Sequence, residues 1–539
     1  MPSLFFILIS VFLAPFAAAG LPCGTRWLEA HRSEMPLPTA AKLAVPQQQE
    51  IKVGTPLGVP VSGDVFLRPS TCRYVGENAY IFVEDSLWDV LVVQPDVDKL
   101  GALFDVATPA DSTRGIYEMA TETFGAVPDV DGDPHVFIFI IDMPNDNVVG
   151  YFDPRISTHV DESQRRDAVY LDAFRLNSDP FLTRGTLAHE FQHLIHWGHD
   201  EDEEDWIEEG LSGYAEELTG FAETDPRMVP GFLENPSLNL TAWPFLSSEA
   251  TPHYGATYLF ASFLHERYGP EMIRTLVAER RNGIFGVDEA FKEMGLVQNY
   301  AGAWGLWVAG NYAADDSFYG YRALRGRRVQ SFPITDLPLE PTEGQVSQQW
   351  GTTNLVLSAS GNIQVEFAGV ADGRYIVWGY AMRGATGEMV AMELDEFNAG
   401  SLQMADVDSA ALVVGRTSLA GGKFTLAAQH YIPTDVPTAV TAASTKGEGF
   451  ALGGAYPNPF NGGVQLPFSL GLSGETELVI FNSLGQRVQL LYSGYMGAGV
   501  HQLHWDGRDE RGVEVASGLY QAVLRAQGQV SVRGLTLIK

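Results

Sequence analysis

The segment Ala188-His189-Glu190-Phe191-Gln192-His193 constrains the fold of this chain more than any other. Its two histidines are four positions apart, and an α-helix places such residues on one face, one turn above the other. Two imidazoles in this arrangement can bind one tetrahedral metal ion. Asp179 and Pro180 suit the start of a helix, and Gly198 is expected to end it. The sequence therefore predicts a metal-binding helix over about residues 180–198.

A second helix is predicted over residues 205–219, with Asp205 as its N-cap and Gly220 as its terminator. It carries the neighbouring carboxylates Glu208 and Glu209. These two side chains point about 100° apart on a helix, so only one of them can face the metal. His199 offers a different third ligand, six residues after His193.

The pair HEFQH and WIEEGLSGYAEE resembles the gluzincin superfamily of zinc peptidases, which includes thermolysin-like peptidases and zinc aminopeptidases. The hyicolysin-like secreted peptidases are the nearest of these in pattern. The resemblance implies that His189, His193 and Glu209 hold the metal, with Glu208 where many relatives have Asn. His199 stands at the metzincin distance, but metzincins need Gly where this chain has His196. Glu209 is therefore preferred over Glu208 and His199, and we expect His196 and His199 to be exposed at the helix end.

These ligands predict the chemistry. Three protein ligands leave a fourth position for water, and zinc lowers the pKa of that water to about 7. Glu190, beside His189 in the motif, is then the expected general base for attack on a peptide carbonyl. Tyr254 is the preferred oxyanion donor, with His253 as its alternative. The sequence thus predicts one catalytic Zn²⁺ and an endopeptidase acting on protein or peptide substrates.

Two upstream segments bear on the same domain. Residues 168–172 resemble the sheet edge that pairs with extended substrate in this superfamily. The acidic residues at 129–133 (DVDGD) are of the kind that bind calcium, but the segment lacks the Gly at position six and the Glu at position twelve of an EF-hand loop. An acidic turn before the strand at Val136 is the preferred interpretation, and a Ca²⁺ site is the alternative.

The chain as a whole reads as an exported protein. Its formal net charge of -33 excludes nucleic acid as a partner, because nothing could neutralise a row of phosphates. An apolar run over residues 4–16, followed by small residues, predicts a signal peptide at 1–19, with a retained anchor as the alternative. In an oxidising compartment the two cysteines, Cys23 and Cys72, are expected to form a disulfide, with two free buried thiols or a lipid-modified Cys23 as the alternatives.

A length of 539 residues predicts several domains. Strand patterns prevail over residues 53–173, helical spacing over 180–326 and short alternating strands after 333. We therefore expect an α+β gluzincin-like peptidase domain followed by two all-β domains. The predicted divisions are a signal peptide (1–19), an N-terminal arm and strand region (20–77), a peptidase domain (78–328), a β-sandwich (333–432), a linker (433–449) and a second β-domain (450–539).

The last β-domain has motifs of its own, which include YPNPFN at 456–461, FNSLGQ at 481–486, the segment around Trp505 and ASGLY at 516–520. This series resembles type IX secretion sorting domains, related to the Ig-like repeat of flagellar hook-capping proteins. The resemblance implies a Gram-negative bacterium, the type IX machinery as a partner, and a secreted or outer-membrane surface-attached protein. A carbohydrate-binding or adhesive module is the alternative.

Two other functions fit the sequence: an inactive surface adhesin on a zinc-peptidase scaffold, and a polysaccharide-binding protein. The second would need an aromatic row in the middle β-domain, for which Trp350, Tyr375, Trp378 and Tyr380 are the candidates. Core packing is the expected role of these four side chains. The sequence leaves the oligomeric state open, with a monomer as the default.

Overall fold

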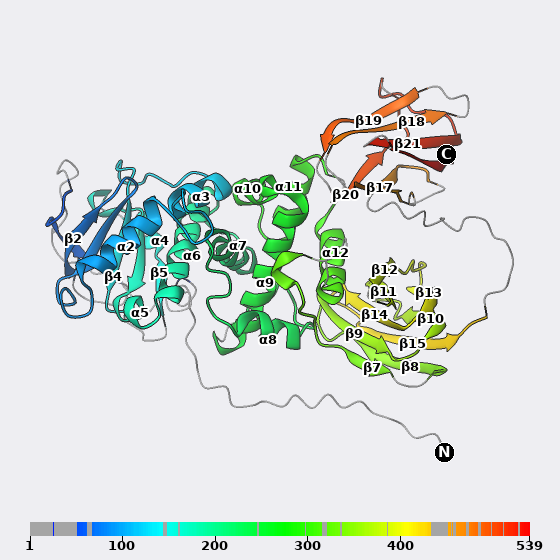
Figure 1. The fold of residues 1–539 in the computed structure, drawn as a ribbon, viewed down its shortest axis with the longest axis horizontal. Coiled ribbons are helices and arrows are strands. Elements are labelled where there is room, and N and C mark those ends of the chain that lie inside the picture. Colours follow the sequence, from blue (N-terminus) through cyan, green and yellow to red (C-terminus); the bar gives the residue numbers. More distant parts are fainter. Residues whose placement is uncertain are drawn as a thin grey trace, which may run out of the picture. The chain divides into compact units, whose positions relative to one another are not determined.

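The chain is described by a computed structural model and divides into two compact units, residues 1–431 and 432–539 (Figure 1). The structure describes Thr25, Leu28 and residues 51–538, except for 62–66, 144–147, 160–161, 245–246, 297, 315–320, 335–336, 385, 433–450, 454, 456–459, 471–473, 483–486, 497–498, 510 and 527–528. The predicted signal peptide (1–19) and linker (433–449) lie outside the described residues. Each unit is considered by itself.

The first unit begins with a six-stranded sheet. Its strands, in spatial order, are β1 (Pro56–Val59), β2 (Arg68–Val75), β3 (Ala79–Glu84), β4 (Val136–Ile141), β6 (Ala168–Asp172) and β5 (Gly150–Phe152). Strands β3, β4 and β6 are parallel, and β5 pairs antiparallel with β6. Every residue of β4 is buried because alternate side chains enter two different cores. Burial on both faces explains the uninterrupted apolar run VFIFII.

Helices follow and flank this sheet. They are α2 (Gln94–Asp105), α3 (Ile116–Phe124), α4 (Pro154–Ser157), α5 (Ala173–Ser178), α6 (Pro180–His199), α7 (Asp205–Thr219), α8 (Met228–Glu234), α9 (Ser247–Tyr268), α10 (Pro270–Ala278), α11 (Ile284–Glu293) and α12 (Tyr300–Ala313). Strand β4 begins at Val136, where the sequence predicts a strand, whereas helix α2 is not predicted. The structure therefore combines helices and sheets in the first unit, as expected.

The two helices with the metal-ligand candidates begin close to where the sequence predicts. The Asp179 carboxylate accepts from Leu182 N at 3.3 Å, so Asp179 is the N-cap of α6. Gly198 does not end this helix, contrary to expectation, because α6 continues to His199. A Cβ at residue 198 would lie 3.0 Å from the Pro128 ring, so close packing accounts for this glycine. Helix α7 ends at Gly220 in the left-handed conformation, as predicted, but its N-cap is Glu204.

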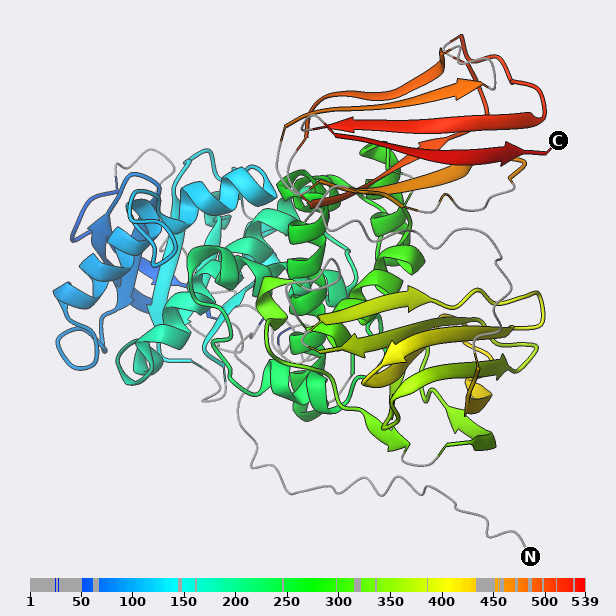
Figure 2. The ribbon, with the colours of Figure 1, turned by 45° about the vertical axis from the view of Figure 1, so that its right-hand side comes forward.

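A β-sandwich completes the first unit (Figure 2). One sheet has the order β13 (Ala399–Val407), β10 (Gly361–Gly369), β15 (Lys423–His430), β8 (Leu339–Gln345), and the other β12 (Thr386–Ala391), β11 (Tyr375–Arg383), β14 (Ser409–Arg416), β9 (Gly351–Leu357), β7 (Phe332–Ile334).

The aromatic residues of this sandwich pack inward. The Trp350 ring lies 5.3 Å from that of Trp304 on α12, and the Tyr380 ring lies 5.4 Å from that of Tyr312. Tyr375 is buried in the sandwich core, and Trp378 is half-buried against the core that α12 shares. Core packing is therefore the role of these side chains, and no aromatic row for a polysaccharide is seen at these four positions.

The second unit contains a three-stranded sheet, β16 (Ala451–Leu452), β17 (Val464–Leu470) and β20 (Gly499–Trp505), and a four-stranded sheet, β19 (Arg487–Met496), β18 (Gly474–Asn482), β21 (Gly518–Ala526) and β22 (Gln529–Leu537). Trp505 is at the centre of its core, with its ring 5.6 Å from Phe460 and 4.9 Å from Tyr520. The Tyr520 hydroxyl donates to Ala516 O at 2.6 Å, an arrangement similar to the tyrosine corner of Ig-like sandwiches.

Two further predictions concern export. Within the described part of the chain, no helix has the length and apolar character needed to cross a bilayer. The Cys72 thiol is free, and it is buried and donates to Tyr74 O at 3.2 Å. Burial raises the pKa of Cys72 to about 11. Its predicted disulfide partner, Cys23, lies outside the described residues.

Candidate metal centre

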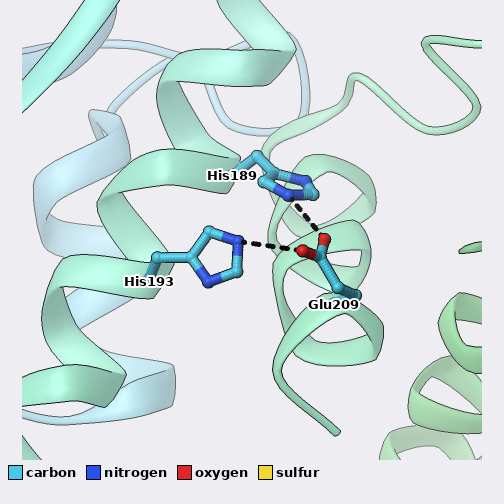
Figure 3. A group of neighbouring side chains, drawn as sticks. All are labelled: His189, His193 and Glu209. Carbon is cyan, nitrogen blue, oxygen red and sulfur yellow. Dashed lines mark hydrogen bonds and ion pairs between the residues drawn. The ribbon is translucent and has the colours of Figure 1, made fainter. Parts of the chain in front are cut away.

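Three buried side chains from two helices converge on one another (Figure 3). His189 and His193 come from α6 and Glu209 from α7, and one ligand atom from each lies within 4.8 Å of the others. The Glu209 carboxylate faces both imidazoles, at 3.2 Å from His189 Nε2 and 3.8 Å from His193 Nε2. Two nitrogen donors and one carboxylate oxygen, all at most 3 % exposed, form a donor set that suits Zn²⁺.

A fourth residue, Glu216, orients the first histidine. Its Oε1 lies 2.8 Å from His189 Nδ1, and its Oε2 accepts from the Thr224 hydroxyl at 2.6 Å. A hydrogen bond from Nδ1 to a carboxylate fixes the imidazole tautomer and leaves Nε2 as the metal-binding nitrogen. Glu216 is not among the site residues predicted from the sequence. Its position seven residues after Glu209, two turns along the same helix face, is the signal that could have identified it.

Glu190 is fully buried and stands beside the strand at the sheet edge. Its Oε2 accepts from the Thr25 hydroxyl at 2.8 Å. The same hydroxyl accepts from Phe152 N on β5 at 2.9 Å. One side chain from the N-terminal region thus connects the carboxylate of the HExxH motif to the backbone of strand β5.

The glycine after Glu209 is required by helix packing. A Cβ at residue 210 would lie 2.8 Å from Thr257 O on α9, closer than side-chain carbons approach in proteins. Gly210 therefore lets α7 pack directly against α9. The Glu209-Gly210 pair combines a buried carboxylate with the close contact that holds its helix in place.

The alternative third ligands lie elsewhere. His199 Nε2 is 3.2 Å from Ala126 O, and His199 is only half-buried. Among the described residues, one cluster of possible metal ligands contains His189 and His193. Its third member is Glu209, and neither Glu208 nor His199 belongs to it. The expectation of exposed histidines at the helix end is wrong for His196, which is fully buried in the packed part of α6.

The oxyanion-donor candidates lie at the start of α9. The Tyr254 ring is buried and packs edge-on against Trp243 at 4.9 Å. His253 is half-buried, and its burial lowers its pKa to about 4, so it is neutral near pH 7. The choice of Tyr254 over His253 as the oxyanion donor stays a prediction.

The strand that is predicted to pair with substrate is the second strand from the edge of the sheet, and not the edge strand itself. Residues 168–172 form β6, which is flanked by β4 and β5 and therefore has no free edge. The edge strand is β5, at Gly150–Phe152. A Cβ at residue 150 would lie 2.6 Å from the Thr186 methyl group, so β5 lies directly against the helix that bears both histidines.

Comparison with known proteins identifies one part of the chain. Residues 460–529 match the FlgD Ig-like domain. This match lies within the second unit and agrees with its two small sheets around Trp505. The C-terminal region is therefore Ig-like. No curated protein matches the chain.

Several solved structures are similar to parts of the chain. The pre-peptidase C-terminal domain of collagenase from Bacillus anthracis is 11% identical, with 20% of this chain and 100% of that chain covered and a TM-score of 0.17. PorZ, a surface component of the type IX secretion system of Porphyromonas gingivalis, is 20% identical (24% and 15% covered, TM-score 0.13), and latent PorU from the same organism is 9% identical (39% and 32% covered, TM-score 0.15). The chain thus spans under a third of PorZ and of PorU. At these TM-scores the likeness carries no argument about fold or function.

Proposed function

We propose that the chain is a secreted zinc-dependent endopeptidase. The observation that carries the proposal is the convergence of His189, His193 and Glu209 on one buried point, with Glu190 on the same helix as the histidines. The donor atoms fit zinc, because two imidazole nitrogens and one carboxylate oxygen leave a coordination position open. The hydrogen bond between His189 Nδ1 and Glu216 adds the second contact expected of a metal-binding imidazole.

In the proposed peptide hydrolysis, each residue of the site has a separate role. When bound, zinc would polarise the peptide carbonyl and acidify a water molecule. The Glu190 carboxylate would accept the proton of that water and return it to the leaving amine. The edge strand β5 offers main-chain groups with which an extended peptide can pair, and Tyr254 is the candidate donor to the oxyanion.

We also infer that the second unit is a sorting module. The FlgD Ig-like match at 460–529 and the predicted signal peptide support export followed by passage through type IX machinery. On this proposal the protein is secreted or attached to the outer surface of a Gram-negative bacterium. Its partners are then that machinery and its protein or peptide substrates.

Metal analysis of two neighbouring variants tests the proposed centre. We expect about one zinc per chain in the wild type and in Glu208→Gln, because Glu208 is half-buried and outside the ligand group. Glu209→Gln replaces the anionic ligand by a neutral amide and should lower the zinc affinity by at least 10-fold. The measurement is zinc content after equilibrium dialysis against buffered zinc. Equal zinc in the two variants, or none in the wild type, would contradict the proposal and leave the inactive adhesin.

A further inference from the structure

A second group of carboxylates lies at the amino ends of β4 and β6, apart from the zinc ligands. Asp129 and Asp131 belong to the turn before β4, and Asp167 directly precedes β6. One oxygen from each lies within 4.8 Å of the others. Because β4 and β6 are parallel neighbours, the fold brings Asp167 to the turn from 36 residues further along the chain.

Asp167 shows that this group is more than a solvated acidic turn. It is only 2 % exposed. Its Oδ2 accepts from Val130 N at 2.9 Å, whereas Oδ1 is buried with no hydrogen-bond partner among the described residues. A buried carboxylate oxygen without a partner carries a large desolvation cost. Burial and the nearby carboxylates together raise the pKa of Asp167 to about 7.

The neighbouring cation does not neutralise the group. Arg166 Nε lies 3.7 Å from Asp131 Oδ2, which leaves one guanidinium for three carboxylates. Asp133, in the same turn, is used differently, because its oxygens contact His135 Nδ1 at 2.5 Å and the Tyr80 hydroxyl at 3.1 Å. Among the described residues the three clustered carboxylates therefore have one cationic contact, and a bound cation would relieve their mutual repulsion.

We propose that Asp129, Asp131 and Asp167 bind a calcium ion that joins the turn before β4 to the start of β6. The donors are all oxygens, which favours a hard cation over zinc. Two ligands on opposite sides of a calcium ion, each at about 2.4 Å, are about 4.8 Å apart, so the spacing fits one ion. The sequence favours an acidic turn over a calcium site here, because residues 129–133 alone lack the buried third ligand.

Calorimetry and thermal unfolding of the full chain, with zinc kept saturating, test this site. We expect one Ca²⁺ per chain and a rise of the unfolding temperature with millimolar CaCl₂ in the wild type and in the control Asp133→Asn. Asp167→Asn should lose the calcium response but fold, because the amide oxygen still accepts from Val130 N and a buried charge is removed. Without calcium it should be at least as stable as the wild type.

Several results would overturn the calcium site. They are the absence of a calcium response in the wild type, an undiminished response in Asp167→Asn, or an equal response to MgCl₂ at the same concentrations. None of these readouts depends on peptide hydrolysis, so the site stands or falls separately from the proposed enzyme.

A different observation, the contact between Thr25 and Glu190, carries a second inference, which rests on the proposed function. The Thr25 hydroxyl donates to the carboxylate that must take the proton from water, and it accepts from the Phe152 N–H of the edge strand. Leu28, three residues later, is buried in the core that contains Tyr151 and Ile156. Both residues follow the predicted signal-peptide cleavage site, so they are expected to remain in the exported chain.

We infer that the Thr25 side chain restrains the Glu190 carboxylate and that a peptide substrate must displace Thr25. Thr25→Val removes both hydrogen bonds at nearly constant volume. Since a hydrogen bond to a charged group is stronger than one between neutral groups, the variant should bind a peptide hydroxamate at least about 10-fold more tightly and show a lower peptide KM. Thr108→Val, a buried threonine that bonds to Asp111, is the matched control.

Hydroxamate affinity separates this inference from the enzyme proposal. If the zinc-loaded chain binds the hydroxamate but cleaves no peptide, the endopeptidase fails while the affinity comparison still tests Thr25. Equal affinity in the wild type and Thr25→Val would overturn the restraint.

Discussion

Glu216 is a residue outside the HExxH motif that contacts a candidate metal ligand, His189. The HExxH pattern and the glutamate before Gly210 predict the three ligand candidates, since helical spacing alone places them on common faces. The pattern does not reveal Glu216, because its contact with His189 Nδ1 depends on how α7 packs against α6. For the same reason the sequence does not reveal the contact between Thr25 and Glu190, which are 165 residues apart.

Replacing Glu216 should weaken zinc binding without unfolding the chain. Glu216→Gln removes the anionic partner of His189, so the zinc affinity should fall between about 10- and 100-fold. Glu217→Gln is the matched control, because Glu217 is the adjacent, half-buried carboxyl on α7 and bonds to Ser262 and Tyr258. Competition with a chelator of known zinc affinity measures both variants. An equal loss in the two variants would contradict an orienting role for Glu216.

At the scale of elements, the sequence predicts the type of each secondary-structure element better than its end points or its position in the fold. Gly198 is predicted to end its helix. Instead, a glycine is needed at this position because Pro128 packs closely against α6. Residues 168–172 read as a sheet edge, but the three-residue strand β5 pairs with them and takes that place. Both errors have one cause: the deciding contact comes from a segment distant in the sequence.

The connection between α6 and α7 contains a buried carboxyl group, that of Glu203. Its titration should make the free energy of unfolding depend on pH. Glu203 Oε1 accepts from Gly283 N at 2.7 Å, before α11. Burial, with smaller effects from Asp200 and Glu204, raises the pKa of Glu203 from 4.5 to about 7. The folded chain therefore binds this proton more tightly than the unfolded chain. The resulting stability is fully present below pH 4.5 and is lost as the pH rises through 7.

Glu203→Gln keeps the acceptor for Gly283 N and removes the titration. Relative to the wild type, the variant should gain up to about 3 kcal/mol of unfolding free energy at pH 8, and the gain should shrink toward pH 5. Urea unfolding of both proteins at the two pH values measures the difference. A gain that does not change with pH would show that Glu203 does not titrate in this range.

At the scale of the whole molecule, the β-sandwich and the helices share a core. Helix α12 is apolar nearly all round because Trp350 and Tyr380 of the sandwich cover its outer face, against Trp304 and Tyr312. Composition and periodicity predict a β-sandwich after residue 333, but they do not show that its sheet packs against a helix. The Ig-like C-terminal region was predictable from its motifs, since Phe460, Trp505 and Tyr520 form its core.

Two truncations should therefore behave differently. A chain ending at Tyr431 loses only the second unit, so its zinc content and unfolding temperature should match those of the full chain. In a host with type IX machinery it should not be released. A chain ending at Ser331 exposes Trp304 and Tyr312 of α12 and should aggregate. Size-exclusion chromatography and zinc analysis distinguish the two, and a soluble, zinc-loaded chain ending at Ser331 would contradict the shared core.

The most direct test of the central proposal compares the wild type with Glu190→Gln for zinc content and casein hydrolysis. We expect about one zinc per chain in both proteins, and hydrolysis at least 100-fold slower in the variant, because Glu190 is proposed to move protons and not to bind the metal. Hydrolysis by Glu190→Gln at the wild-type rate, or absence of zinc from the wild type, would contradict the proposal.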